Sequence, residues 1–137
     1  MGIIEVQNQI IEEFELFDEW MDKYQYLIDL GRDLPLIDDD DKIDERLIAG
    51  CQSKVWLKAE KAEDNLIFKA DSDAIITKGI IALLIRVFSN QRPEAITQAE
   101  LFFIDKIGLS DHLSPTRANG LLNMIRQMKS YASLYSQ

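Results

Sequence analysis

Apolar residues recur at helical spacing in the first part of the chain and predict two amphipathic helices. Over residues 3–17 glutamates take one face, and the other face is apolar, with Ile3, Val6, Ile10, Phe14 and Phe17. We expect a second helix to begin after Asp18, whose side chain suits an N-cap, and to end at Gly31, a residue type common at helix C-termini.

The middle of the chain changes to the alternation that is typical of strands. Residues 54–59 alternate, with Val55 and Leu57 on the same side, and residues 66–70 form a second short apolar run. The polar residues 60–65 between them are expected to form the connecting turn. The pattern therefore predicts an antiparallel β-hairpin.

Two helices are predicted to follow the hairpin. Residues 74–88 are apolar nearly all round, which indicates a central buried helix, and either Ser72 or Asp73 can cap it. A further helix over residues 94–103 begins directly after Pro93.

The last helix is predicted to begin after Ser114. The Ser114 side chain can cap it, and Pro115 suits the first helical position because its missing N–H would have no partner there. Helices around one hairpin predict an α+β fold, with a small antiparallel sheet packed against helices. A length of 137 residues fits a single domain over residues 1–137.

Charge and cysteine content narrow the choice of partners and compartment. The formal net charge of −9 disfavours nucleic acid and anionic membranes, because both carry negative charge, and favours a partner with a basic patch. One cysteine allows no intrachain disulfide. No secretory signal and no apolar run of membrane-spanning length stands out, so we expect a cytoplasmic protein.

Cys51 is the first candidate for chemistry. A lone cysteine is often a small buried hydrophobic residue, and that reading stays open. However, Cys51 follows Gly50, precedes the first strand and has the polar neighbours Gln52 and Ser53. Functional residues are frequent in loops of this kind, and a thiolate there would be favoured by Lys54, by Arg117 or by a helix start.

His112 permits an alternative chemistry, that of a Cys–His hydrolase. The signal is weak, because any single cysteine and histidine would satisfy it, and a structural hydrogen bond just before a helix is the simpler role. Metal binding has little support: one cysteine and one histidine are too few ligands. The acidic run at residues 38–41 lacks the glycine spacing of a calcium loop and is expected to be a solvated loop.

Two charged residues and two glycines remain as candidates. Asp73 suits a helix N-terminus, whereas Arg117 lies in a first turn, where a cation is mildly disfavoured, so a specific partner for Arg117 is expected. Gly79 and Gly120 interrupt helical patterns and are expected to mark close helix packing.

Four segments in the same order resemble the SufE family. The segment IAGCQSKVW at residues 48–56 resembles its sulfur-acceptor motif. The other three are YQYLIDLGRDLP at 24–35, DSDAIITKGIIAL at 71–83 and LSDHLSPTRANGLLNMIR at 109–126. The resemblance therefore extends over nearly the whole chain.

The resemblance implies a sulfur carrier for iron–sulfur cluster assembly. It implies that Cys51 accepts a persulfide sulfur from a SufS-like cysteine desulfurase, stimulates that enzyme and delivers the sulfur to a scaffold such as SufBCD. The pyridoxal phosphate cofactor would belong to the desulfurase, and this chain would hold no cofactor or metal. Gly50, Gln52, Asp73 and Arg117 match motif positions around the cysteine or facing the partner.

The resemblance also implies the SufE/IscU-like α+β fold and, with it, an alternative function. IscU-type scaffolds build a cluster on three cysteines, whereas this chain has one. A protein that interacts through its thiol without transferring sulfur is the other alternative.

Overall fold

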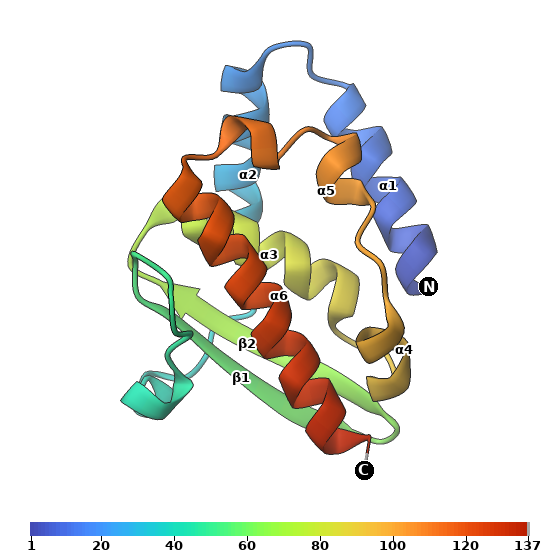
Figure 1. Cartoon of the computed structure of the whole chain (residues 1–137), viewed down its shortest axis with the longest axis vertical. Helices are drawn as coiled ribbons and strands as arrows, with labels where there is room; N and C mark the ends of the chain where they lie inside the picture. Colours follow the sequence, from blue (N-terminus) through green and yellow to red (C-terminus); the bar gives the residue numbers. More distant parts are fainter. Residues whose placement is uncertain (137) are drawn as a thin grey trace.

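The computed structural model describes residues 1–136 as an α+β fold of helices and one antiparallel hairpin (Figure 1). The helices are α1 (Ile3–Glu15), α2 (Trp20–Arg32), α3 (Ile75–Phe88), α4 (Pro93–Gln98), α5 (Phe103–Lys106) and α6 (Pro115–Tyr135). The strands are β1 (Val55–Ala62) and β2 (Asn65–Ser72), and short 3-10 turns occur at Asp39–Asp41, Asp44–Arg46 and Ser110–His112. The hairpin forms one side of the molecule, with α3 and α6 next to it and α1 beyond α3.

The hairpin is longer than the alternation of the sequence predicts. The strands pair from Val55 with Ser72 to Ala62 with Asn65, so the turn has two residues rather than six. The apolar alternation stops early because the last part of β1 is half-buried or exposed, while backbone pairing continues without burial. The apolar alternation in the sequence therefore indicates only the buried part of the hairpin and underestimates its length.

The predicted central buried helix is confirmed as α3, and glycines bring it close to α2. A Cβ atom placed on Gly79 would lie 2.3 Å from the carbonyl oxygen of Leu27, and one on Gly31 would lie 2.9 Å from the Gly79 nitrogen. Both distances are too short for real atoms, so only glycine permits this approach. The expectation of close packing at Gly79 is therefore confirmed.

The predicted N-cap of α2 is wrong. Glu19 has the extended N-cap backbone conformation, and its side chain makes no capping hydrogen bond. Asp18 lies one residue earlier, outside the cap position, because α1 already ends at Glu15 and the chain bends between the two helices. A side chain suited to capping does not fix the start of a helix by itself.

The predicted helix over residues 94–103 is replaced by α4 and α5 with an extended linker between them. The linker is held by Gln7 of α1, which is fully buried. The Gln7 amide donates to the Glu100 carbonyl at 3.1 Å and accepts from the Phe103 N–H at 3.2 Å. A side chain from a distant helix thus supplies hydrogen bonds that local helix formation would otherwise provide.

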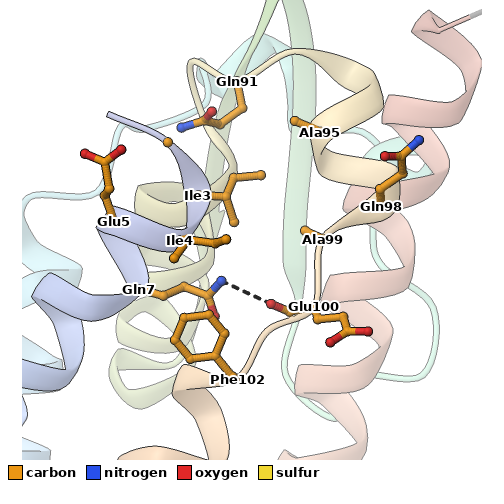
Figure 2. A pocket seen from close by; sticks show the side chains of 11 residues that line it. Ile3, Ile4, Glu5, Gln7, Gln91, Ala95, Gln98, Ala99, Glu100 and Phe102 are labelled. Atoms are coloured by element: carbon orange, nitrogen blue, oxygen red, sulfur yellow. Dashed lines mark hydrogen bonds between the residues drawn. The ribbon is translucent and has the colours of Figure 1, made fainter.

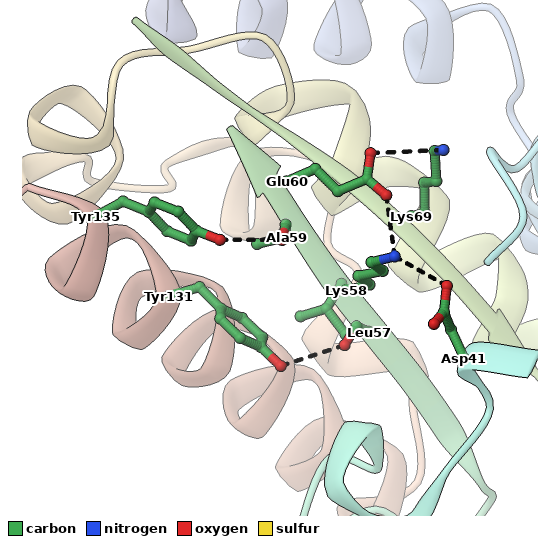
Figure 3. A network of polar contacts seen from close by, with 8 residues as sticks. All are labelled: Asp41, Leu57, Lys58, Ala59, Glu60, Lys69, Tyr131 and Tyr135. Carbon is green, nitrogen blue, oxygen red and sulfur yellow. Dashed lines mark hydrogen bonds and ion pairs between the residues drawn. The ribbon is translucent and has the colours of Figure 1, made fainter. Parts of the chain in front are cut away.

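Contacts from outside the hairpin cover both of its edges. The hydroxyl groups of Tyr131 and Tyr135 on α6 donate to the β1 carbonyls of Leu57 and Ala59 at 3.3 and 3.4 Å (Figure 3). On the β2 edge, the N–H of Ala70 donates to the Pro35 carbonyl, and the Ala70 carbonyl accepts from Ile37.

In the acidic run Asp38, Asp39 and Asp40 are exposed, as expected of a solvated loop, whereas Asp41 departs from that expectation. Asp41 is half-buried and pairs with Lys58 of β1 at 2.9 Å, and Lys58 also pairs with Glu60 (Figure 3). The Lys58 ammonium holds the pKa of Asp41 below its usual value. One member of the run therefore attaches this loop to the hairpin.

A charged cluster joins α1, α2 and α3. The two terminal guanidinium nitrogens of Arg86 donate hydrogen bonds to the Glu13 carboxylate, one of them at 2.6 Å. The Tyr26 hydroxyl also donates to Glu13. The hydrogen bond from Arg86 lowers the pKa of Glu13, whereas burial and the Glu13 contact raise the pKa of Tyr26 to about 12. Three helices are therefore linked through one carboxylate.

We expect the Glu13 contacts to stabilise the fold only while Glu13 is ionised. Since its pKa is lowered in the folded state, this stability is complete above the unfolded pKa and is lost as the pH falls through the folded value. Glu13→Gln should lower the free energy of unfolding at pH 7 by about 1–2 kcal/mol, with a smaller gap in acid. Urea unfolding across this pH range measures it, with exposed Glu12→Gln as the control. A gap that does not change with pH would contradict an ionic origin.

In the described part of the chain, no helix combines the length and the apolar character that crossing a membrane requires.

Candidate functional site around Cys51

Cys51 lies in a loop whose two ends are fixed to the hairpin. Before it, the N–H of Ile48 donates to the Val55 carbonyl at 2.9 Å, and Ile48 is buried. The chain then turns at Gly50, where φ is +82°, a conformation that glycine adopts without strain. The expected position of Cys51 in a loop before the first strand is confirmed, with the turn formed at Gly50.

The thiol of Cys51 is half-buried against α6. Its Sγ atom lies 3.7 Å from the carbonyl oxygen of Gly120, to which it donates a weak hydrogen bond. Gly120 has room here: a Cβ atom on it would lie 3.6 Å from Sγ, an ordinary contact distance. The thiol is therefore neither locked in the hydrophobic interior nor freely exposed.

A small cavity of about 70 Å³ opens beside the thiol. It is lined by Cys51, Gln52, Ser53, Thr77, Ile80, Thr116, Arg117, Gly120 and Met124. A site needs only about 10–15 Å³ by this kind of measure to hold a water molecule. The cavity can therefore take one further atom on Sγ without displacing α3 or α6.

Burial raises the pKa of the Cys51 thiol. At neutral pH the resting group is therefore the protonated thiol, which is a weak nucleophile. The expectation that a nearby cation would favour the thiolate does not describe this resting position. Movement of the loop into water, or a partner that adds positive charge, would increase the thiolate fraction.

Asp73 fixes the other end of the Cys51 loop. Its carboxylate accepts from the Lys54 N–H at 3.0 Å, and its own N–H donates to the Lys54 carbonyl at 3.3 Å. Neither Asp73 nor Ser72 is the N-cap of α3, because Ala74 holds that position and no side chain caps it. The cap expected from the sequence is wrong, and Asp73 instead joins the loop to the start of α3.

Gln52 and Arg117 line the same cavity from two different elements. Gln52 is exposed on the loop, and Arg117 is exposed in the first turn of α6. Ser114 caps this helix as predicted, because its hydroxyl accepts from the Arg117 N–H at 3.2 Å. Of the residues named with Cys51, these two line its cavity, while Gly50 and Asp73 shape its loop.

Asn123 is a contact residue that reasoning from the sequence missed. Its side-chain amide, on α6, donates to the Gly50 carbonyl at 3.2 Å. The sequence holds a faint signal, since Asn123 lies one helical turn after Gly120 and so on nearly the same face of the helix. The spacing predicts a contact with the loop only once the loop is known to lie on α6.

His112 lies elsewhere and does not pair with the thiol. Its ring stacks on Trp20 with centroids 3.9 Å apart, and its Nδ1 atom bonds to the Gly108 carbonyl at 3.0 Å. It is absent from the residues that line the Cys51 cavity. The structural role expected for His112 fits these contacts, and the Cys–His arrangement of a hydrolase is not formed.

Within residues 1–136, no group of three or more histidine, cysteine or acidic side chains is placed to hold a metal ion.

A larger groove of about 580 Å³ lies between α1 and the α4–α5 linker (Figure 2). Ile3, Ala99 and Phe102 contribute apolar surface there, and the Gln7–Glu100 hydrogen bond lies at its base. Neither cysteine nor histidine is among the residues that line this groove.

Comparisons with known proteins agree with the resemblance. The sequence profile described as "SufE: Fe-S metabolism associated domain" matches residues 8–132. An uncharacterized SufE-like protein of Rhizobium meliloti (strain 1021) is 44% identical over 130 residues, covering 91% of this chain and 93% of that protein. A second, from Rhizobium etli, is 35% identical over 132 residues, covering 93% of this chain and 89% of its own length.

A solved structure has the same fold. The solution structure of a hypothetical protein from Thermus thermophilus superposes with a TM-score of 0.78, covering 95% of both chains. Its sequence identity of 17% is low, so this likeness concerns the fold alone.

Proposed function

Because this chain belongs to the SufE family, which is associated with Fe–S metabolism, we propose that it carries sulfur as a persulfide on Cys51. In this proposal a cysteine desulfurase supplies the sulfur and a cluster scaffold receives it. The observation that carries the proposal is a single half-sheltered thiol, on a glycine loop, beside a cavity with room for one more atom.

The transfer is a thiol exchange and needs no external oxidant or reductant. The Cys51 proton leaves to solvent or a base of the partner, and the thiolate attacks the terminal sulfur of the donor's cysteine persulfide. A sulfur–sulfur bond forms at Cys51 while the donor's bond to that sulfur breaks, and the donor cysteine leaves as a thiolate. Delivery to the scaffold repeats the exchange with Cys51 as the leaving thiolate.

The cavity supports a sheltered position for the loaded sulfur. A persulfide is readily attacked by other thiols, so exclusion from solvent would lengthen its lifetime. The cavity next to Sγ exceeds the space that one water molecule needs, and Arg117 at its rim carries a charge that suits a persulfide anion. The same burial that raises the thiol pKa would then protect the product.

The partners follow from the same chemistry. A SufS-like desulfurase would hold the pyridoxal phosphate that releases sulfur from cysteine, so this chain needs no cofactor of its own. A scaffold such as SufBCD would be the acceptor. The net charge of −9 favours docking on a basic surface of either partner. Gln52, Asp73 and Arg117 lie around the loop and are proposed to face the desulfurase.

Intact-mass measurement tests this function directly. After incubation with a SufS-like desulfurase and cysteine, we expect the protein to gain about 32 Da per accepted sulfur, and a reductant should remove it because persulfides are reversible. Omission of cysteine is the control. If no desulfurase adds mass that reductant removes, the proposed transfer role is wrong.

A further inference from the structure

Two side-chain hydrogen bonds, one of them the weak bond of the thiol, join the middle of the Cys51 loop to α6. The loop ends are fixed by Ile48 to the Val55 carbonyl and by Lys54 to Asp73. Between these points, residues 49–53 contact α6 through the Asn123–Gly50 hydrogen bond of 3.2 Å and through the weak thiol contact at 3.7 Å. The loop is therefore fixed at both ends by hydrogen bonds and is held between them by its contacts with α6.

Asn123 and Gly50 fit each other closely. A Cβ atom on Gly50 would lie 2.3 Å from the Asn123 amide nitrogen, so the amide occupies the space that any other residue at position 50 would need. The oxygen of the same amide lies 3.5 Å from a guanidinium nitrogen of Arg126, which favours the orientation with nitrogen toward the loop. The contact therefore depends on shape as well as on one hydrogen bond.

We propose that Asn123 is a latch that sets how often the Cys51 loop leaves its sheltered position. Cys51 is the next residue after Gly50, so release of the Gly50 carbonyl frees the thiol from the Gly120 contact as well. Asn123 is a positioning residue and does not touch the reacting sulfur. The inference rests on the proposed function for its biological meaning, but the opening that it describes belongs to the free protein.

The contribution of Asn123 to the closed position of the loop can be expressed as a change in the open population. A neutral hydrogen bond contributes a net amount that corresponds to roughly three- to tenfold in an equilibrium. Removing it should therefore raise the open population of the loop by about that factor, without a matching change in global stability. Because the thiol is half-buried when the loop is closed, reaction with an added alkylating reagent follows the open population.

The test compares two latch variants with a matched control on the same helix. Asn123→Ala removes the side chain, and Asn123→Leu keeps much of its bulk but has no donor. Asn119→Ala changes the same residue type at an exposed position of α6 that does not line the Cys51 cavity. Iodoacetamide labelling of Cys51 under native conditions should be about three- to tenfold faster in both Asn123 variants and unchanged in Asn119→Ala.

Hydrogen exchange separates a latch from general loosening. The β1 amides that pair with β2 should keep the native exchange rate in both Asn123 variants. Unchanged labelling of Cys51 in both variants would overturn the proposal. So would acceleration of the β1 amides by the same factor as the labelling, because the effect would then be global unfolding.

These readouts use the free protein and so are independent of sulfur transfer. If the Asn123 variants label faster but no desulfurase loads the native chain, the latch stands and the proposed function fails. If the native chain gains sulfur but labelling is unaffected by Asn123, the function stands and the latch is wrong.

Discussion

Cys51→Ser is expected to abolish sulfur acceptance altogether. Serine has nearly the same shape, so the loop and its cavity should persist, but a hydroxyl cannot take over the terminal sulfur of a persulfide. The variant should show no mass gain of about 32 Da after incubation with desulfurase and cysteine, and reductant should change nothing. Desulfurase turnover should fall to the level seen without added protein, since the enzyme's persulfide would have no acceptor.

Two comparisons make the Cys51→Ser result specific. Cys51→Ala should behave like Cys51→Ser, because the loss concerns the nucleophile and not the size of the side chain. The thermal midpoints of both variants should stay close to native, since the thiol makes only a weak contact with Gly120. If Cys51→Ser stimulated turnover as well as the native protein, the chain would activate the desulfurase by binding alone, and sulfur transfer would be excluded.

Gly79→Ala is expected to destabilise the fold even though alanine is the better helix former. Alanine would gain about 1 kcal/mol of helix propensity. Its Cβ, however, would lie 2.3 Å from the Leu27 carbonyl oxygen, which is backbone and cannot rotate away. Overpacking of this kind costs about 1–3 kcal/mol or more. Since α2 and α3 must move apart, we expect a net loss of about 2 kcal/mol, with a thermal midpoint roughly 5–10 °C lower.

Gly120→Ala is the matched control, because Gly120 is also a glycine within a helix. Its Cβ would lie 3.6 Å from the Cys51 Sγ atom, an ordinary contact, so the propensity gain is not offset by a clash. We expect a change between zero and about 1 kcal/mol of stabilisation. Thermal and urea unfolding of both variants measure the contrast. Equal effects of the two substitutions would show that α2 and α3 are not held as close as Gly79 indicates.

The sequence correctly placed Cys51 in a loop before the first strand because the signal is local. A glycine, a cysteine and polar neighbours directly before a strand can be read from adjacent letters. Whether the thiol was buried or exposed could not be read there, because its surroundings come from α3 and α6. Asp73 shows the same limit: it looked like a helix cap, but its carboxylate bonds to the Lys54 backbone 19 residues earlier.

The sequence by itself determined the apolar faces of the helices, the buried character of α3, the hairpin, the Ser114 cap and the family. Each of these depends on residue types within a few positions of one another or on motif order. Only the tertiary structure decided how Gln7 holds the α4–α5 linker, how Gly79 admits α2, and how Asn123 meets Gly50. These contacts join residues that are far apart in the chain, as the sequence separation of 96 between Gln7 and Phe103 illustrates, and they arise from packing that no local pattern encodes.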